Sequence, residues 1–142
     1  MREFRHFLPI SVRYSDIDAQ GHVNNTRFGT YIESGRLAYV KDLGLWDGKD
    51  FFNLGLIVAD VHIAYLRPIL FGQGITVATR VAHIGNKSMK FEFQILNETS
   101  GDLFATAETV NVGFDYNSGK TITISPYWRK TISAFEGVSF SE

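Results

Sequence analysis

The sequence predicts an α+β domain in which an antiparallel sheet curls over one long helix. The first observation is a single long segment, from about Asn25 to Leu43, whose apolar residues recur at helical spacing. The second is a series of four β-strand patterns after it, with no second long helical pattern among them. The third is size, because 142 residues, 44% of them hydrophobic, suffice for one domain (1–142) with a substantial core.

An initial strand is expected over residues 7–14, before the long helix. Its apolar residues alternate with the period of a half-buried strand, and Pro9 indicates the edge or start of a sheet. The alternating positions are Leu8, Ile10, Val12 and Tyr14.

The long helix is expected to begin at Asn25, a residue type favoured as an N-cap, and to end near Gly44, which suits a helix C-terminus. Gly35 costs about 1 kcal/mol of helix propensity relative to Ala, so we expect it to permit close contact with the sheet. The positions that recur at helical spacing are Phe28, Tyr31, Ile32, Gly35, Ala38, Tyr39 and Asp42.

The strands after the helix are expected over residues 56–66, 75–84, 88–96 and 103–115, and the third alternates most clearly. In the first, one face should carry Ile57, Val61, Ile63 and Tyr65, and the other Asp60 and His62. A turn at 117–119 then leads to a short strand at 121–124. Ser125 followed by Pro126 is typical of a helix start, and predicts a short last helix to about Phe135.

Composition excludes several classes of function. The absence of cysteine excludes disulfides, thiolate metal sites and cysteine nucleophiles, and the four histidines show no metal-ligand spacing. A net charge of −1 argues against nucleic-acid binding. The sequence has no apolar run of membrane-spanning length, and its first residues lack the apolar core of a signal peptide. We therefore expect a cytoplasmic protein without a metal.

Residues 16–25, Asp-Ile-Asp-Ala-Gln-Gly-His-Val-Asn-Asn, carry the chemistry. Short polar residues favour turns and helix caps, so this segment should lead into a helix N-terminus, where free N–H groups attract negative charge. A carboxylate and a histidine at such an end can stabilise an oxyanion. A purely structural turn is the alternative. A calcium loop is excluded, because Arg27 stands where an EF-hand needs a bidentate Glu.

This motif, the helix after it and Tyr65-Leu-Arg-Pro68 on the next strand resemble the hotdog-fold thioesterases. The closest branch is the 4-hydroxybenzoyl-CoA thioesterase-like one, and the loop is also similar to that of plant acyl-carrier-protein thioesterases. The resemblance spans Pro9 to about Ile124. It implies a hotdog fold, an antiparallel sheet of five to six strands wrapped around one long central helix, and pairing into dimers.

The resemblance also implies roles for residues of the motif. It places the catalytic carboxylate at Asp18, as a general base or a nucleophile, and the backbone N–H that polarises the thioester carbonyl at Asn25. His22 would assist the acid and orient water or substrate. Gln20 departs from the acyl-carrier-protein pattern, in which an Asn is usual. Asn24 should hold the loop through bonds to backbone and lie at the substrate.

Several further residues have two interpretations. Asp16 should shape the loop and not react, since one carboxylate suffices. Glu33 is the alternative catalytic acid, because one hotdog branch uses a helical Glu. Arg67, Lys87 and Lys90 could bind CoA phosphates, with a solvated surface as the other interpretation.

The predicted function is hydrolysis of acyl-CoA or acyl-carrier-protein thioesters, without a cofactor beyond the CoA of the substrate. The alternatives are a hotdog dehydratase or hydratase acting on thioesters, and a non-catalytic acyl-CoA-binding protein. We expect a homodimer, because the strand at 56–66, apolar on one face and mixed on the other, could continue the sheet across a two-fold axis. The sequence leaves open whether such dimers pair into tetramers.

Overall fold

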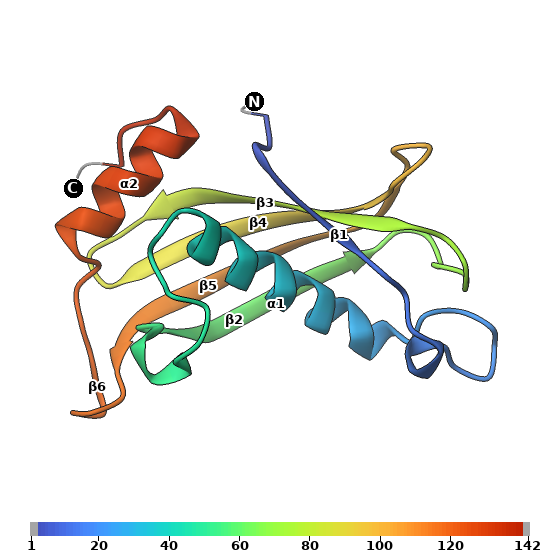
Figure 1. Cartoon of the computed structure of the whole chain (residues 1–142), viewed down its shortest axis with the longest axis horizontal. Coiled ribbons are helices and arrows are strands. Elements are labelled where there is room, and N and C mark those ends of the chain that lie inside the picture. The colour runs from blue at the N-terminus through green and yellow to red at the C-terminus, as the bar shows by residue number, and fades with distance from the viewer. Residues whose placement is uncertain (1–2, 141–142) are drawn as a thin grey trace.

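A computed structural model of the chain describes residues 3–140, and its main feature is one antiparallel sheet of six strands. The strands are β1 (His6–Ile10), β2 (Leu56–Tyr65), β3 (Ile75–Ile84), β4 (Ser88–Asn97), β5 (Leu103–Asp115) and β6 (Lys120–Thr121). Their order is β1-β3-β4-β5-β2, and β6 pairs with β5 (Figure 1). The four strands predicted after the helix are therefore confirmed nearly to the residue.

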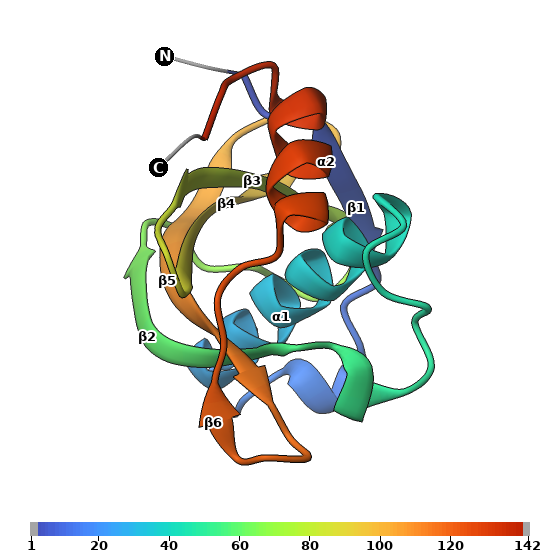
Figure 2. The ribbon, with the colours of Figure 1, turned by 90° about the vertical axis from the view of Figure 1, so that its left-hand side faces the viewer.

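The sheet curls, and the helix α1 (Asn25–Asp42) lies within its curve (Figure 2). α1 packs mainly on β3, β1 and β4. The core fills the space between them with apolar side chains that alternate along β4, namely Met89, Phe91, Phe93 and Ile95. A second helix, α2 (Pro126–Glu136), lies across one end of the sheet, so the chain has two helices in the described residues.

Gly35 lies where α1 crosses β3. A Cβ atom at this position would lie 2.6 Å from Val77 Cγ1 and 2.8 Å from Thr79 Oγ1. Only a residue without a side chain allows this approach, which confirms the predicted role of Gly35.

Both helices begin with a side-chain cap. The Ser125 hydroxyl accepts from the Trp128 N–H at 3.2 Å, and Pro126 occupies the first turn, as predicted for α2. In α1 the cap is Asn24, whose Oδ1 accepts from the Thr26 N–H at 3.0 Å. The prediction of Asn25 as the cap was wrong by one residue, because Asn25 already has helical geometry.

The first strand is shorter than predicted. β1 ends at Ile10, and Tyr14–Asp16 form a 3-10 turn. The turn forms because the Asp16 carboxylate accepts a hydrogen bond from the Arg13 N–H at 3.0 Å, which draws the chain out of the sheet. The predicted strand at 121–124 is likewise reduced to β6.

A β-bulge changes which residues of β2 share a face. The register shifts between Val58 and Asp60, so Val58 pairs with Asn111 and Val61 with Thr109. Val58 and Val61 therefore face α1 together, and Ile57 points to the opposite face. The prediction that Ile57 shares the face of Val61 was wrong, because one extra residue reverses the alternation.

No helix among residues 3–140 is long and apolar enough to span a membrane.

Candidate active site

The motif forms a tight loop before α1. Its ends are held together by a bridge between Ile17 and Val23. The Asp18 N–H donates to the His22 carbonyl at 2.8 Å, and the Gly21 N–H donates back to the Asp18 carbonyl at 3.0 Å. Gly21 has φ +82°, which favours glycine. The sequence thus folds locally so that Asp18 and His22 lie across the loop from one another.

Asp16 anchors this loop from inside the protein. Its side chain is 1% exposed, and it accepts from the Tyr31 hydroxyl at 2.8 Å and from the Arg13 N–H at 3.0 Å. Guanidinium nitrogens of Arg13 and Arg27 lie 3.4 and 3.6 Å from its Oδ1. Burial raises the pKa of Asp16, but the hydrogen bonds of Arg13 and Tyr31 and the charge of Arg13 outweigh it and hold the pKa below its usual value. Asp16 holds the loop in place.

The N-terminus of α1 is linked to the loop through Asn24. Its N–H donates to the Asp16 carbonyl at 2.8 Å, and its side-chain oxygen accepts from the N–H and the hydroxyl of Thr26. Asn24 therefore bonds to backbone, as predicted. The Asn25 N–H, at the first helical position, finds no protein acceptor among residues 3–140. That N–H remains available to a ligand.

Asp18 and His22 lie beside this helix end and are both half-buried. The Asp18 carboxylate accepts from the Gln20 N–H at 2.9 Å, and within the described part of the chain no other donor reaches it. His22 forms a backbone bridge with Leu70, which fixes the loop against the segment before β3. The arrangement combines a carboxylate with spare acceptor capacity, a histidine and a free backbone donor.

A hollow of about 430 Å³ lies between α1 and β2, starting at the first turn of the helix. Its lining includes Thr26, Gly29, Glu33, Val58, Val61 and Phe93. Val58 and Val61 are exposed because β2 is the last strand of the sheet. The hollow has one largely apolar wall and reaches Thr26, the residue after Asn25, so it suits an apolar group.

Glu33 faces this hollow and is held by a buried guanidinium. Both of its carboxylate oxygens lie near Arg36 Nη2, at 2.8 and 3.0 Å. Arg36 is 5% exposed and donates through Nη1 to Asn111, whose amide donates to Thr109 at 2.9 Å. Burial lowers the pKa of Arg36, and the Glu33 carboxylate opposes this effect. Glu33 is thus tied to a polar network on the inner face of the sheet.

The three predicted phosphate-binding residues are not brought together. Arg67 lies at the loop end of the sheet and pairs with Asp102 at 3.2 Å. Lys90 pairs with Glu108 at 2.7 Å on the outer face of the sheet. Lys87 lies before the first residue of β4, at the end of the sheet opposite the loop, about 33 Å of strand away. Within one chain, Lys87 cannot reach the motif loop.

Sequence reasoning missed Arg13, Arg27 and Tyr65. The two arginines flank Asp16, and the Tyr65 hydroxyl lies 3.4 Å from the Asn25 carbonyl. The i, i+3 spacing of Arg13 and Asp16 was a usable signal. For Arg27 and Tyr65 only the three-dimensional arrangement gives the contact.

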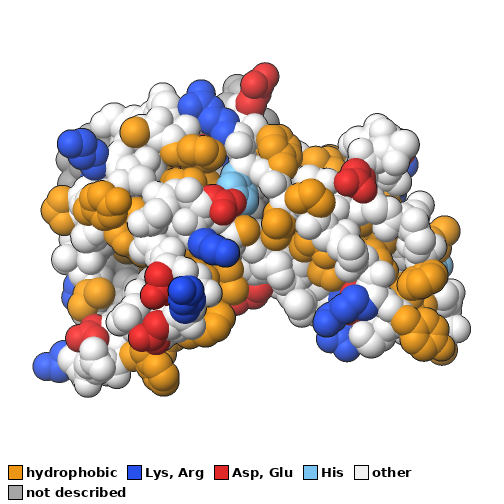
Figure 3. All heavy atoms as spheres, viewed as in Figure 1, with side chains coloured by type: hydrophobic (Ala, Val, Ile, Leu, Met, Phe, Trp, Pro, Cys, Tyr) orange, Lys and Arg blue, Asp and Glu red, His pale blue; other side chains and the backbone are white. Residues whose placement is uncertain are grey.

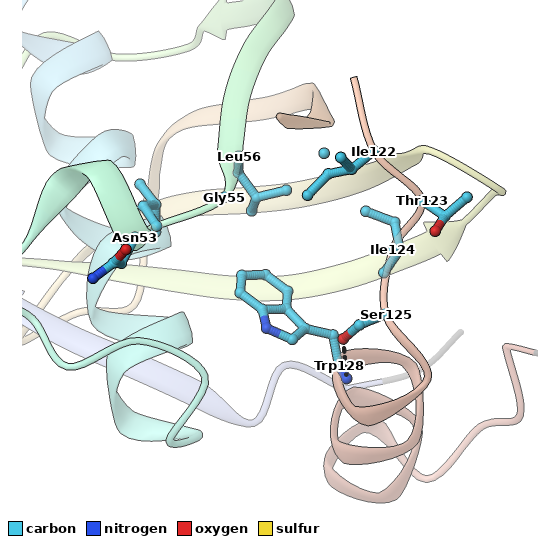
Figure 4. A pocket seen from close by; sticks show the side chains of 10 residues that line it. Asn53, Gly55, Leu56, Ile122, Thr123, Ile124, Ser125 and Trp128 are labelled. Carbon is cyan, nitrogen blue, oxygen red and sulfur yellow. Dashed lines mark hydrogen bonds between the residues drawn. The ribbon is translucent and has the colours of Figure 1, made fainter. Parts of the chain in front are cut away.

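A second cavity, of about 120 Å³, lies far from the loop (Figure 4). It is lined by Asn53, Leu56, Ile122, Ile124 and Trp128, at the end of the sheet where β2 begins. It offers neither a carboxylate nor a histidine. Among residues 3–140, no three His, Asp or Glu side chains lie close enough to hold a metal ion.

The chain belongs to the thioesterase-like superfamily, whose family model matches residues 12–132. It is 28% identical to a putative acyl-CoA thioesterase, YneP of Bacillus subtilis, over 89% of this chain and 92% of that protein. It is 24% identical to the long-chain acyl-CoA thioesterase FadM of Escherichia coli, over 87% and 93% respectively. A thioesterase of Thermus thermophilus, crystallised with coenzyme A and zinc, superposes with a TM-score of 0.84 at 30% identity, over 96% of this chain and 98% of that one.

Proposed function

We propose that this protein hydrolyses acyl-CoA thioesters to a carboxylic acid and free CoA, on a hotdog fold whose central helix is α1. The observation that carries the proposal is the Asn25 N–H, which has no protein acceptor among residues 3–140, at the end of the Asp18 loop and next in the chain to Thr26, which lines an apolar hollow. Names of related proteins support the same class of substrate. The hollow would take the acyl chain, and the thioester carbonyl would lie at the start of α1.

Asn25 would polarise the carbonyl. Attack on a thioester places negative charge on the carbonyl oxygen, and a backbone N–H at a helix N-terminus stabilises that charge. Because Asn24 already caps the Thr26 N–H, the Asn25 donor is the one left for the substrate.

Asp18 would supply the reactive carboxylate. As a general base it takes a proton from water while the water oxygen bonds to the carbonyl carbon. The tetrahedral intermediate then collapses, the carbon–sulfur bond breaks, and the thiolate receives a proton. As a nucleophile, Asp18 would instead form an anhydride that water hydrolyses. His22 would orient water or the leaving group. Single-turnover hydrolysis in ¹⁸O-water tests the nucleophilic route, because Asp18 acquires the label only when water adds to the Asp18 carbonyl of the anhydride.

We further propose a homodimer as the working unit, located in the cytoplasm. β2 is an edge strand, and its inward-facing Val58 and Val61 are 37% and 50% exposed. A second copy pairing along β2 would cover these side chains and the unpaired strand edge. In such a dimer, Lys87 could serve the site of the partner subunit.

The direct test is release of free thiol from a panel of short, long and aromatic acyl-CoAs. We expect turnover of at least one member, with the Asp18→Asn variant as the inactive reference. Hydration of an enoyl-CoA without thiol release would assign the protein to the dehydratases. Tight acyl-CoA binding with neither reaction would make it a binding protein.

A further inference from the structure

We propose that Arg13, Arg27, Tyr14 and Phe71 form a binding subsite for the adenine nucleotide of the CoA thioester. This inference rests on the proposed function, because it assumes a CoA-linked substrate. It places the phosphates at the two arginines and the adenine ring on the aromatic pair, next to the motif loop.

The two arginines leave a surplus of positive charge. Arg13 and Arg27 approach one carboxylate, Asp16, at 3.4 and 3.6 Å, distances too long for strong hydrogen bonds. Their side chains are 64% and 40% exposed, whereas the Asp16 side chain is fully buried. Two guanidinium groups around one carboxylate have spare N–H donors at the surface. Arginine is well suited to bind phosphate oxygens with such donors.

An aromatic pair lies beside them at the surface. The rings of Tyr14 and Phe71 meet edge to face, with centroids 6.5 Å apart and planes at 90°. Tyr14 is 84% exposed and Phe71 is 60% exposed, which is unusual for large apolar rings. An exposed ring face can stack on any nucleobase, because every base has a π-face. Figure 3 shows blue Lys or Arg atoms and orange hydrophobic atoms together at the right-hand end of the molecule.

The position of this subsite fits the path of a CoA arm. Tyr14 follows Arg13 in the chain, and Phe71 follows Leu70, which bridges to His22. The subsite therefore borders the loop that holds Asp18. Acidic groups nearby are the carboxylates of Asp16, Asp18 and Glu98, of which Asp16 alone contacts the two arginines. The other cations considered above are paired with acids or lie at the far end of the sheet.

The first experiment measures binding of adenosine 3′,5′-bisphosphate by calorimetry, at low salt and without any acyl group. Tyr14→Ala and Arg13→Gln should each weaken binding about tenfold. Inorganic pyrophosphate separates the two parts, because its binding should respond to Arg13→Gln and not to Tyr14→Ala. Raising the salt concentration should weaken the arginine contribution. This result does not depend on hydrolysis, so it stands or falls separately from the proposed function.

The second experiment compares acyl-CoA with the matching acyl-pantetheine, which lacks the nucleotide. The ratio of kcat/KM for acyl-CoA to that for acyl-pantetheine should fall about tenfold in Tyr14→Ala and Phe71→Ala. These two variants do not touch Asp16, so they remain informative if Arg13→Gln loosens the loop. Tyr127→Ala and Lys130→Gln on α2 are matched controls, and should leave the ratio unchanged.

Two results would overturn the inference. The first is wild-type binding of adenosine 3′,5′-bisphosphate by Tyr14→Ala, Phe71→Ala and Arg13→Gln alike. The second is a change of oligomeric mass in Tyr14→Ala by light scattering, which would assign the aromatic pair to a contact between copies of this chain.

Discussion

The two ends of α1 differ in how far their polar groups are hydrogen-bonded within the protein. At its N-terminus, within residues 3–140, the Asn25 N–H has no acceptor and the Asp18 carboxylate accepts one hydrogen bond. At its C-terminus Tyr39 is fully buried, and its hydroxyl donates to the buried Glu136 carboxylate of α2 at 2.5 Å.

Further hydrogen bonds pair the polar groups near the C-terminal end of α1. The Val81 N–H donates to the same Glu136 carboxylate at 3.1 Å, and Arg129 donates to the carbonyls of Gly85 and Phe140 at 2.8 and 2.9 Å. The Nδ1 atom of His6 is an exception, since it is buried and has no hydrogen-bond partner in the part of the chain that the structure describes. The difference is that polar groups at the C-terminal end are largely paired within the protein, whereas the N-terminal, open end leaves polar groups free, as the proposed site requires.

The largest effect should come from Asp18→Asn at the open end. The change removes the base but keeps the oxygen that accepts from Gln20, so we expect a loss of about 10² to 10⁴ in kcat. Thiol release measures it. The urea midpoint should be unchanged, and wild-type turnover by this variant would move the catalytic role to Glu33.

Glu136→Ala, at the C-terminal end of α1, should lower the free energy of unfolding and leave kcat unchanged. It leaves the Tyr39 hydroxyl and the Val81 N–H buried without their carboxylate, which should cost roughly 2–4 kcal/mol in the free energy of unfolding. Tyr39→Phe removes one of these bonds and should cost less. Equilibrium urea unfolding gives both values, and kcat at 25 °C should stay near wild type. A stable Glu136→Ala variant with impaired turnover would reverse the contrast between the ends.

Two glycines of α1 sharpen the comparison on a smaller scale. Gly35→Ala forces a Cβ against Val77 and Thr79, and should destabilise the protein by about 1–3 kcal/mol. Gly29→Ala, nearer the open end, meets no atom within 4 Å, and should gain up to about 1 kcal/mol from helix propensity. Thermal and urea unfolding of the pair should show opposite signs, and equal signs would contradict the assignment of close packing to Gly35 alone.

The last prediction concerns how the free energy of unfolding depends on pH. The pKa of Asp16 lies below its unfolded value near 3.8, so its stabilisation is present above that pH and is lost as pH falls through the folded pKa. Asp16→Asn should lower the free energy of unfolding by about 1–2 kcal/mol at pH 7. It should also flatten the decline below pH 4, measured by urea unfolding at several pH values. If the free energy of unfolding of Asp16→Asn declines below pH 4 as steeply as that of the wild type, another carboxylate is responsible for the decline.

The regular elements were predictable because their signal is local. Alternation in β4 and the Ser125–Pro126 pair each depend on neighbours in the sequence. The end of β1 and the bulge in β2 were not predictable in this way. The end of β1 depends on the hydrogen bond from the Arg13 N–H to Asp16. The bulge lies at Ala59, a residue type that does not indicate a bulge in a sequence.

The site could be predicted only as far as its motif extends. The ten residues from Asp16 to Asn25 lie together because they are contiguous, whereas their chemical roles stay predictions. The place of Lys87 was not predictable, because sequence does not show which end of a sheet a hairpin occupies, and its role stays a prediction. Arg27 was missed because it meets Asp16 across the loop and the first turn of α1.

The buried Arg36 has a consequence for how this chain can vary. Its Nη1 donates to Asn111 and its Nη2 pairs with Glu33, while its Nε has no hydrogen-bond partner in the described part of the chain. Replacing Arg36 alone would leave the Asn111 Oδ1 in the core without this donor, and replacing Asn111 alone would leave Arg36 Nη1 without this acceptor while the ion pair with Glu33 remains. Substitutions at the two positions are therefore coupled, and the joint change to apolar residues is less harmful than the sum of the single ones. Stability therefore favours changing the two positions together over changing either one alone.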